Sequence, residues 1–536
     1  MQTTQKKGHS LSFQRLVNLL TIVIVNVCIL SLWLTSISLA AQPRYGGTYR
    51  RSASEPRTFD PHKDSGANTP RIINSTYNTL LRWNPDQTEI ELDLAESWKR
   101  VDDCTYIFKI PRGVRFHNLP PVNGREVTSE DVKYSIERLA GMHGEKPKYK
   151  NRYYFEGKLE SITTPDRYTV VFKTKEPYAP FISYIASSWS AIVPREAVEK
   201  FGDLKRKAIG TGPFMLGDRM KGSHIILVRH PNYFKKGFPY LDKIHMKIME
   251  NVTVTMSAYL AGKLDIVTAQ HFQVRTIKRK VPDTVFVRGK LLYNFHIRIP
   301  PWSDKRPLKP PFDNPKVRQA IAMAIDKQKL MKLAWGGYGT VQIGPVPNWP
   351  PYSLPEEDQV KYDPEQARKL LAEAGYPDGF SAEMISPSNP ALTGGAQVAQ
   401  AMLKAVGINV NLKILEFAQF FSRAWKFDYE MAYTSLTAGF DPEEYLVPYF
   451  GDTKKATYYK WNNKEIHRMI EEQRKILDPQ KRARMIQEIQ RKILKDAPMV
   501  FVYSLDVVGA FKPYVYPKRM FINPYAGETE DIWLDK

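Results

Sequence analysis

The chain has 536 residues, of which 43% are hydrophobic and 12% aromatic, so it can bury more than one hydrophobic core. Its formal net charge is +22, and such a balance can suit an anionic membrane surface, a nucleic acid or an acidic ligand. The basic residues are scattered, however, apart from short clusters at 205–207 and 278–280, and no nucleic-acid-binding motif accompanies them. We therefore interpret them as a solvated surface and expect no nucleic-acid partner.

The first forty residues have the pattern of an export signal. They begin with basic residues, continue with a mostly apolar stretch over 16–39, and end with small side chains at Ser38 and Ala40, just before a predicted cut at Ala41. The apolar stretch is also long enough to span a bilayer as an uncleaved anchor. We predict a signal peptide over 1–40, with retention as an anchor as the alternative, and hence a periplasmic or extracellular protein.

Cleavage at that position would leave Cys104 as the only thiol, because Cys28 lies in the leader. The mature chain could then form no internal disulfide, even in an oxidising compartment. The leader contains three basic and no acidic residues, so the mature chain would carry 22 − 3 = +19. Its stability must come from the burial of side chains.

Helix signals appear first near residue 128. Thr128 followed three residues later by Asp131 is a capping-box pattern, and an apolar stripe over 132–139 continues it. Much later, Asp363 and the proline after it predict the start of another helix, which we expect to end at Gly375. The sequence therefore predicts helices at both places.

A strand, a helix and a second strand are predicted between residues 380 and 414. The first strand covers 380–385, the helix covers 396–406 after two glycines, and 408–414 alternates between apolar and polar residues as a strand should. This order is typical of a βαβ unit and of an α/β fold. Two more amphipathic helices follow around 466–470 and 486–493, with a break at Asp478.

Several further motifs follow one another in a fixed order. They are Phe59-Asp60-Pro61-His62, Tyr77-Asn78-Thr79-Leu80-Leu81-Arg82, Leu94-Ala95-Glu96-Ser97-Trp98, the segments 106–117 and 127–139, Gly210-Thr211-Gly212-Pro213-Phe214, and the segments 231–234, 260–266, 311–320, 362–375 and 496–498. Together they resemble the extracellular solute-binding proteins of peptide- and nickel-type ABC importers, known as family 5. A set of motifs in one order is far more specific than any one of them.

The resemblance implies an α/β, two-lobed periplasmic-binding-protein fold of type II, with an extra subdomain inserted in the first lobe. By analogy, lobe I covers 42–305 and 499–536, with the inserted subdomain near 86–208, and lobe II covers 306–498. Members of the family capture a solute between the lobes by hinge closure and deliver it to a membrane permease, whose separate ATPase supplies the energy. We accordingly expect a monomer whose partners are a small solute and an ABC permease.

Signals for catalysis or metal binding are missing from the sequence. There is no Gly-x-Ser-x-Gly elbow, no His-Glu-x-x-His pair and no phosphate-binding loop, and the histidines have no metal-ligand spacing. We predict no enzyme activity, no cofactor and no metal. Two other hypotheses stay open: an exported hydrolase using Glu430 and Asp441, and an anchored sensory or adhesive ectodomain on the same fold.

The resemblance places residues 426–442 in the cleft between the lobes. Peptide-binding members have a carboxylate just before the Asp-Pro pair of this segment, which binds the ligand's ammonium group; here that position is Thr437 or Ala438. Dipeptide-binding members also use an arginine ahead of the helix predicted at 396–406, but 386–397 contains no charged residue. These departures argue against a short zwitterionic peptide and leave longer peptides and neutral solutes such as oligosaccharides.

Hydroxyl and aromatic side chains are the candidates to replace the missing charges. Aromatic planes suit sugars and apolar side chains, and hydroxyl groups fix orientation. The predicted ligand-binding residues are Tyr433, Ser435, Thr437 and Phe440 on the cleft segment, Trp335 and Tyr338 after a helix expected over 317–332, and Trp189. The alternative is that these aromatic side chains fill hydrophobic cores.

Overall fold

The computed structural model describes residues 42–536 except 64–68, 144–149, 302–306, 438, 453–458, 460 and 521–529. The predicted signal peptide thus lies outside the described residues. Residues 45–534 form one compact unit. Within the described part of the chain, no helix is both long and apolar enough to cross a membrane.

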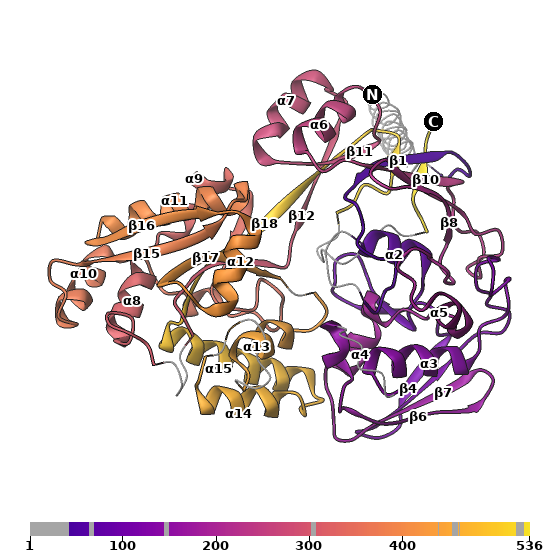
Figure 1. Cartoon of the computed structure of the whole chain (residues 1–536), viewed down its shortest axis with the longest axis horizontal. Coiled ribbons are helices and arrows are strands. Elements are labelled where there is room, and N and C mark those ends of the chain that lie inside the picture. Colours follow the sequence, from indigo (N-terminus) through magenta and orange to yellow (C-terminus); the bar gives the residue numbers. More distant parts are fainter. Residues whose placement is uncertain are drawn as a thin grey trace, which may run out of the picture. The chain divides into compact units, whose positions relative to one another are not determined.

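The first hydrophobic core lies between two four-stranded sheets and several short helices (Figure 1). One sheet has the order β1 (Thr48–Ala53), β10 (Lys243–Ile248), β9 (His224–Arg229), β8 (Phe214–Met220). The other is antiparallel, in the order β4 (Ser97–Arg100), β5 (Thr105–Lys109), β7 (Thr169–Thr174), β6 (Leu159–Asp166). The second sheet falls inside the predicted inserted subdomain.

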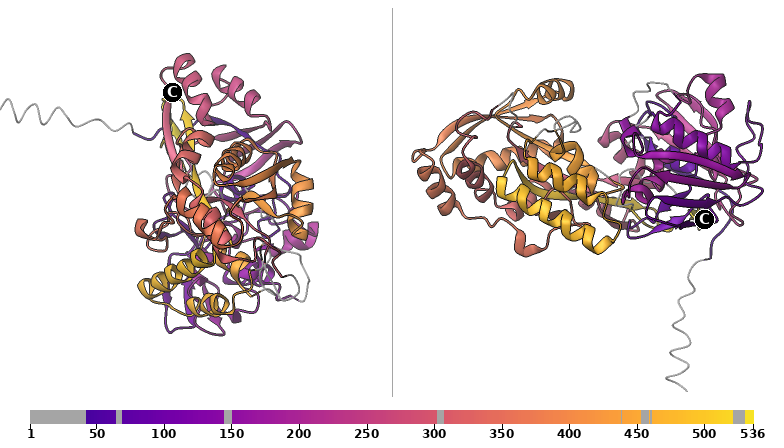
Figure 2. Two further views of the ribbon diagram at one scale, coloured as in Figure 1. Left: turned by 90° about the vertical axis from the view of Figure 1, so that its left-hand side faces the viewer. Right: turned by 90° about the horizontal axis from the view of Figure 1, so that it is seen from below.

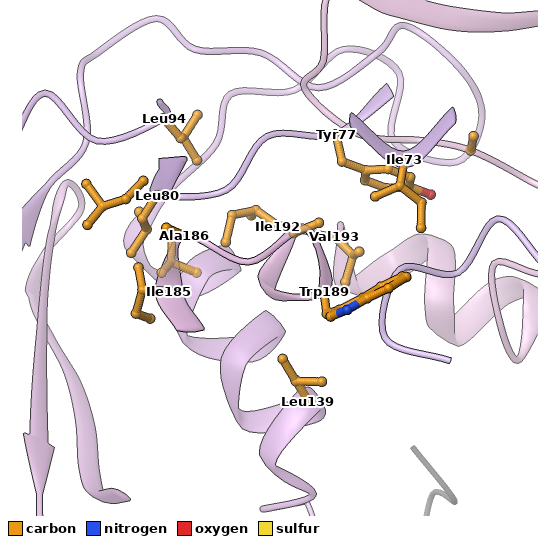
Figure 3. Close-up of a cluster of buried hydrophobic side chains, with 14 of the residues drawn as sticks. Ile73, Tyr77, Leu80, Leu94, Leu139, Ile185, Ala186, Trp189, Ile192 and Val193 are labelled. Carbon is orange, nitrogen blue, oxygen red and sulfur yellow. The ribbon is translucent and has the colours of Figure 1, made fainter. Parts of the chain in front are cut away.

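The helices of this region are short. They are α2 (Pro70–Thr76), α3 (Ser129–Ala140), η1 (Lys150–Tyr154), α4 (Phe181–Ile185), η2 (Ser188–Ser190) and α5 (Arg195–Phe201), and the small strand pairs are β2 (Leu81–Trp83) with β3 (Ile90–Leu92) and β19 (Val515–Tyr516) with β20 (Trp533–Leu534). The helix predicted near 128 is confirmed as α3, where Thr128 and Asp131 form the expected capping box. Figure 3 shows part of the core that these elements enclose.

The second core surrounds an eight-stranded mixed sheet. Its main order is β11 (Ile266–Ala269), β18 (Met499–Phe511), β13 (Tyr293–Arg298), β17 (Met431–Thr437), β15 (Phe380–Pro387), β16 (Ile408–Leu415), while β12 (Val285–Lys290) and β14 (Gly339–Val341) also pair with β18. A small third cluster covers the β11 end with α6 (Val252–Leu260), η3 (His271–Gln273) and α7 (Val274–Lys280).

Helices pack around this sheet and against one another (Figure 2). They are α8 (Pro315–Met323), α9 (Lys327–Trp335), η4 (Glu356–Asp358), α10 (Pro364–Glu373), α11 (Pro390–Lys404), α12 (Phe417–Lys426), α13 (Glu443–Phe450), α14 (Lys464–Gln473) and α15 (Pro479–Asp496). Helix α11 packs on the face that carries Met384 and Tyr433, and α12 packs on the face that carries Ile385 and Ala432. Successive strand residues point to opposite faces, which explains this division.

The predicted βαβ unit is confirmed. Strands β15 and β16 are parallel neighbours joined by α11, and the helix expected at Asp363 is α10, with the Asp363 carboxylate accepting the Gln366 N–H at 2.8 Å. The two C-terminal helices are α14 and α15, and Asp478 caps the second of them.

Two boundaries were predicted wrongly. The helix expected at 396–406 begins six residues earlier, because Asn389 caps it and Pro390 occupies its first turn. The glycines that suggested a break lie inside α11, where Gly395 leaves room for the ring of Tyr433. The helix expected over 317–332 is two helices, α8 and α9, since the Asp326 side chain caps a new start at Lys327.

Two chain segments of the eight-stranded sheet run from one core to the other. One is β18, whose first half pairs with β13 and β14 and whose second half pairs with β11 and β12. The other is the run from β12 into β13. The predicted lobe bounds, 42–305 with 499–536 and 306–498, stay a prediction; β13 and the start of β18 lie in the same sheet as β17.

Candidate functional site

Strand β17 carries the first predicted ligand residues. Tyr433 and Ser435 pair with Ile297 and Phe295 of β13. The Tyr433 ring is fully buried and packs against Gly395 of α11, and burial raises the pKa of its hydroxyl well above the ordinary value. Ser435 is half-buried. Tyr433 therefore faces the interior of the second core, whereas the Thr437 side chain and Ala438 lie outside the described residues.

The segment after β17 belongs to both cores. Phe440 is 3% exposed and packs into the first core, although its chain neighbours Leu436 and Tyr445 belong to the second. Gln87, in the turn between β2 and β3, donates a hydrogen bond from Nε2 to the Gly439 carbonyl. The two cores thus meet at the segment that the sequence pointed to.

Two buried polar groups beside this segment have no hydrogen-bond partner among the described residues. One is Oε1 of Gln87, and the other is the indole N–H of Trp83. The Trp83 ring makes an edge contact with Trp349, at 6.0 Å between centroids, and touches both cores. Unpaired buried polar groups are costly, so these two atoms mark a place where the described residues leave hydrogen-bonding capacity unused.

The carboxylates of the hydrolase hypothesis have separate partners. Asp441 is buried and accepts two hydrogen bonds from Arg482, at 2.5 and 2.8 Å. Glu430 is exposed and accepts the backbone N–H of Glu383 at 2.6 Å. Asp441 is therefore neutralised within a buried ion pair, and it does not form an acid–base pair with Glu430.

A second group of aromatic side chains includes two predicted residues. Trp335 is the last residue of α9 and is 7% exposed, and its ring lies 4.8 Å from that of His271 in η3. The Tyr338 ring lies 6.3 Å from His271 and is covered by the Arg288 guanidinium at 4.8 Å. The structure therefore brings Trp335 and Tyr338 together with His271, which no motif in the sequence indicated.

This group also presents unpaired polar atoms. Nδ1 of His271 and the indole N–H of Trp335 are buried without a hydrogen-bond partner in the described part of the chain. Burial lowers the pKa of His271, so the ring is neutral at physiological pH. A neutral imidazole and an indole N–H can orient an uncharged polar group beside the aromatic planes.

Trp189 lies in the first core. Its side chain is 2% exposed and belongs to the same buried cluster as Leu139, Ile192 and Val193 (Figure 3). This position agrees with the alternative that the sequence left open, in which the aromatic ring fills a core. A buried strand or helix residue and a cleft residue have the same local sequence pattern, so composition could not separate them.

The histidines in the family motifs are buried and hold the first core together. His62 bonds to the Ala191 carbonyl at 3.0 Å, and His117 bonds to the Gly212 carbonyl at 3.0 Å. Burial lowers the pKa of each to about 3, so both are neutral. No cluster of three or more metal-ligating side chains occurs among the residues that the structure describes.

A cavity of about 440 Å³ lies beside α15, away from the predicted ligand residues. Its lining includes Arg318, Trp461, Asn463 and Asp496. The Asp496 carboxylate already accepts hydrogen bonds from Trp461 and Asn463, at 3.0 and 2.8 Å. These polar groups of the cavity wall thus bond to one another.

Comparison with known proteins agrees with this arrangement. Residues 89–457 match the family model of bacterial extracellular solute-binding proteins, family 5 Middle. Heme-binding protein A of Haemophilus influenzae is 28% identical over 79% of this chain and 80% of its own length, and di/tripeptide-binding protein 2 of Pseudomonas aeruginosa is 28% identical over 85% and 88%.

Among solved structures, the periplasmic binding protein DppA of Helicobacter pylori in complex with the peptide STSA has a TM-score of 0.75 and 25% identity. The match covers 92% of this chain and 99% of that one. The expected two-lobed type II fold is therefore confirmed. The chain belongs to the bacterial extracellular solute-binding proteins of family 5, and it is the extracytoplasmic solute-binding subunit of an ABC importer.

Proposed function

We propose that this subunit captures a peptide longer than a dipeptide and closes its two lobes, built around the two cores, over it. The observation that carries the proposal is the meeting of both cores at Gly439 and Phe440, the segment that presents solute in the family. The relatives named for peptides support the solute class: di/tripeptide-binding protein 2 and the DppA structure with its tetrapeptide.

The solute is held by uncharged groups at its ends. Neither Thr437 nor Ala438 can pair with an ammonium group, and 386–397 offers no cation for a carboxylate. The unpaired groups of Trp83 and Gln87, and those of Trp335 and His271, supply donors and acceptors instead. Main-chain amides of an extended peptide suit such groups, because each residue offers one donor and one acceptor.

Among the predicted ligand residues, we assign solute contact to Trp335, Tyr338, Ser435 and Thr437. Tyr433 packs in the second core and Phe440 in the first, so both hold the segment 426–442 in place. Trp189 also belongs to the first core. The subunit does no covalent chemistry of its own. After export by the signal over 1–40, it works as a monomer that delivers the closed complex to its permease.

The solute class is tested by native mass spectrometry of protein purified from its own source, followed by thermal unfolding with chosen probes. The tetrapeptide STSA and a pool of tri- to nonapeptides are expected to raise the melting temperature by several degrees, because a ligand at one hundred times its Kd stabilises the folded state by about 2.7 kcal/mol. A shift with oligosaccharides and none with any peptide would overturn the peptide assignment.

The leader is tested by sequencing the N-terminus of mature protein. Cleavage yields Ala41 as the first residue, as we propose. A mature chain that still begins at Met1 would instead favour the anchored ectodomain.

A further inference from the structure

A second contact between the cores follows directly after the segment 426–442, where α13 and α14 lie beside α4 (Figure 1). We call it the polar seam. It consists of Glu443, Glu444 and Arg474 from the second lobe and Tyr154, Tyr178 and Tyr184 from the first.

Glu443 is the centre of the polar seam. Its side chain is fully buried, and Oε1 accepts the hydroxyl of Tyr184 at 2.8 Å and that of Tyr178 at 3.4 Å. Oε2 accepts Nε of Arg474 at 2.6 Å. The ion pair lies within the second lobe, whereas both hydroxyl groups come from the first, so separating the lobes breaks the hydrogen bonds but leaves the ion pair intact.

Glu444 makes a parallel contact. One of its oxygens accepts the Tyr154 hydroxyl at 2.6 Å, and the other accepts the Gly439 N–H at 2.8 Å. The Tyr154 ring stacks on that of Tyr184, with centroids 3.8 Å apart and planes 9° from parallel. This stacking fixes the directions of two hydroxyl groups that face the two adjacent carboxylates.

Backbone and surface contacts complete the boundary. The Ala179 N–H donates to the Arg474 carbonyl at 2.7 Å. Lys475 and Glu176 form an ion pair at 2.6 Å, but their side chains are 53% and 49% exposed. Hydrogen bonds from neutral donors to buried carboxylates are strong, whereas exposed ion pairs contribute little. The tyrosine hydroxyl groups therefore dominate this contact.

We propose that the polar seam is a closure latch, in which Tyr154 and Tyr184 act as positioning residues that hold the closed arrangement of the lobes and so raise the affinity for solute. The proposal rests on the hinge closure proposed above. A contact made only in the closed form shifts the open–closed equilibrium, and the apparent Kd for solute follows the fraction of closed molecules. The carboxylates must lose water to close, which keeps the latch reversible.

The latch is tested without solute, by measuring the distance between the lobes. Spin labels are attached to Lys99→Cys on β4 and Arg484→Cys on α15, both exposed and outside the polar seam, in a Cys104→Ser background. The distance distribution is recorded for the parent protein and for Tyr154→Phe with Tyr184→Phe, which keeps both rings. We expect the double variant to move most of the population to longer distances.

Single variants and a matched control make the result decisive. Tyr184→Phe alone is expected to shift a smaller fraction, and it decides the question if the double variant fails to fold. Glu176→Gln removes the exposed pair at the same boundary and is expected to leave the distribution unchanged. Unchanged distances in the tyrosine variants, or an equal shift in the control, would overturn the latch.

This measurement separates the latch from the solute class. A peptide screen without any hit would overturn the proposed solute and leave the distance result as it stands. Conversely, a peptide that raises the melting temperature while the tyrosine variants stay closed would overturn the latch alone. Where a peptide binds, its Kd is expected to rise about tenfold in the double variant, through faster dissociation, because two hydrogen bonds to carboxylates are lost.

Discussion

Leu403 in α11 and Glu443 in α13 are both fully buried in the second lobe, but their surroundings differ. Leu403 packs among apolar side chains such as Ala399 and Met384, whereas Glu443 meets a guanidinium and two tyrosine hydroxyl groups. Apolar packing holds a lobe together permanently, because opening it exposes surface that water does not satisfy. A polar contact loses less on opening, since water replaces its hydrogen bonds. Apolar packing therefore suits the interior of a lobe, and polar contacts suit a boundary between two lobes that opens and closes.

The largest effect is expected from the buried ion pair that fixes the start of α13. Asp441→Asn leaves the Arg482 guanidinium buried without its carboxylate, which costs about 3–5 kcal/mol. Urea unfolding followed by circular dichroism measures this loss. Asp358→Asn, which affects the more exposed pair with Arg491, is the matched control and should cost less than about 1 kcal/mol. Equal losses in the two variants would mean that burial does not set the strength of these pairs.

Breaking the apolar interior comes next. Leu403→Ala should lower the free energy of unfolding by about 2–5 kcal/mol, because it removes buried methyl groups and leaves a cavity. The half-buried Leu370 in α10 offers a comparison, and Leu370→Ala should cost clearly less. Both changes should leave the distance between the lobes unaltered in the folded protein. A change in that distance would show that packing inside the lobe also controls closure.

A smaller effect is expected from pH, through Glu444. Burial is the main cause that raises the pKa of its carboxyl to about 7 in the closed form, and nearby Asp441 adds to it, while Tyr154 and the Gly439 and Phe440 N–H groups oppose it. A carboxyl with a raised pKa binds its proton more tightly in the closed form than in the open form. The closed form is therefore fully stable relative to the open form below about pH 4.5, and it loses stability as the pH rises toward 7. If Glu444 regains its ordinary pKa of 4.5 on opening, the ratio of closed to open molecules should fall by up to roughly seventyfold between pH 5 and pH 8.

The control for this pH experiment is Glu444→Gln, whose side chain is neutral at every pH and still offers an oxygen that accepts the Tyr154 hydroxyl. Its distance distribution between the lobes should be nearly independent of pH over the same range. If the parent and Glu444→Gln respond alike to pH, another group controls closure.

The smallest effect is expected from the exposed pair at the boundary. Lys475→Ala should change both stability and solute affinity by less than about 1 kcal/mol, because water screens the charges. Calorimetric titration with a peptide found in the screen checks the affinity. A large loss of affinity would mean that the exposed ion pair, and not the polar seam, stabilises the boundary between the lobes.

The sequence predicted elements well where local signals agree. Asp363 capping α10, Thr128 capping α3 and the alternation in β16 are read from neighbouring residues, and the structure confirms them. The prediction of a helix start after Gly395 was wrong, because the role of this glycine depends on Tyr433, nearly forty residues later. Glycine reads as a helix end in isolation, but here it makes room for an aromatic ring.

The candidate site was predictable only in part, for the same physical reason. The family motifs located the segment after β17, but burial separates Tyr433 and Trp189 from the half-buried Ser435 and Tyr338, and burial is a property of the whole fold. His271 and Gln87 have no sequence signal, since each gains its role from a contact made across a long stretch of chain. The polar seam likewise joins residues more than 250 positions apart.

Strand β18 has a mechanical consequence. Along one edge, Leu505 pairs with Gly339 of β14 and Val508 pairs with Ala269 of β11, so one uninterrupted ribbon changes partners within three residues. A continuous strand twists and bends easily but stretches hardly at all, since its backbone length is fixed. We therefore expect the two halves of the molecule to tilt by bending of this ribbon, because its backbone can twist but cannot lengthen.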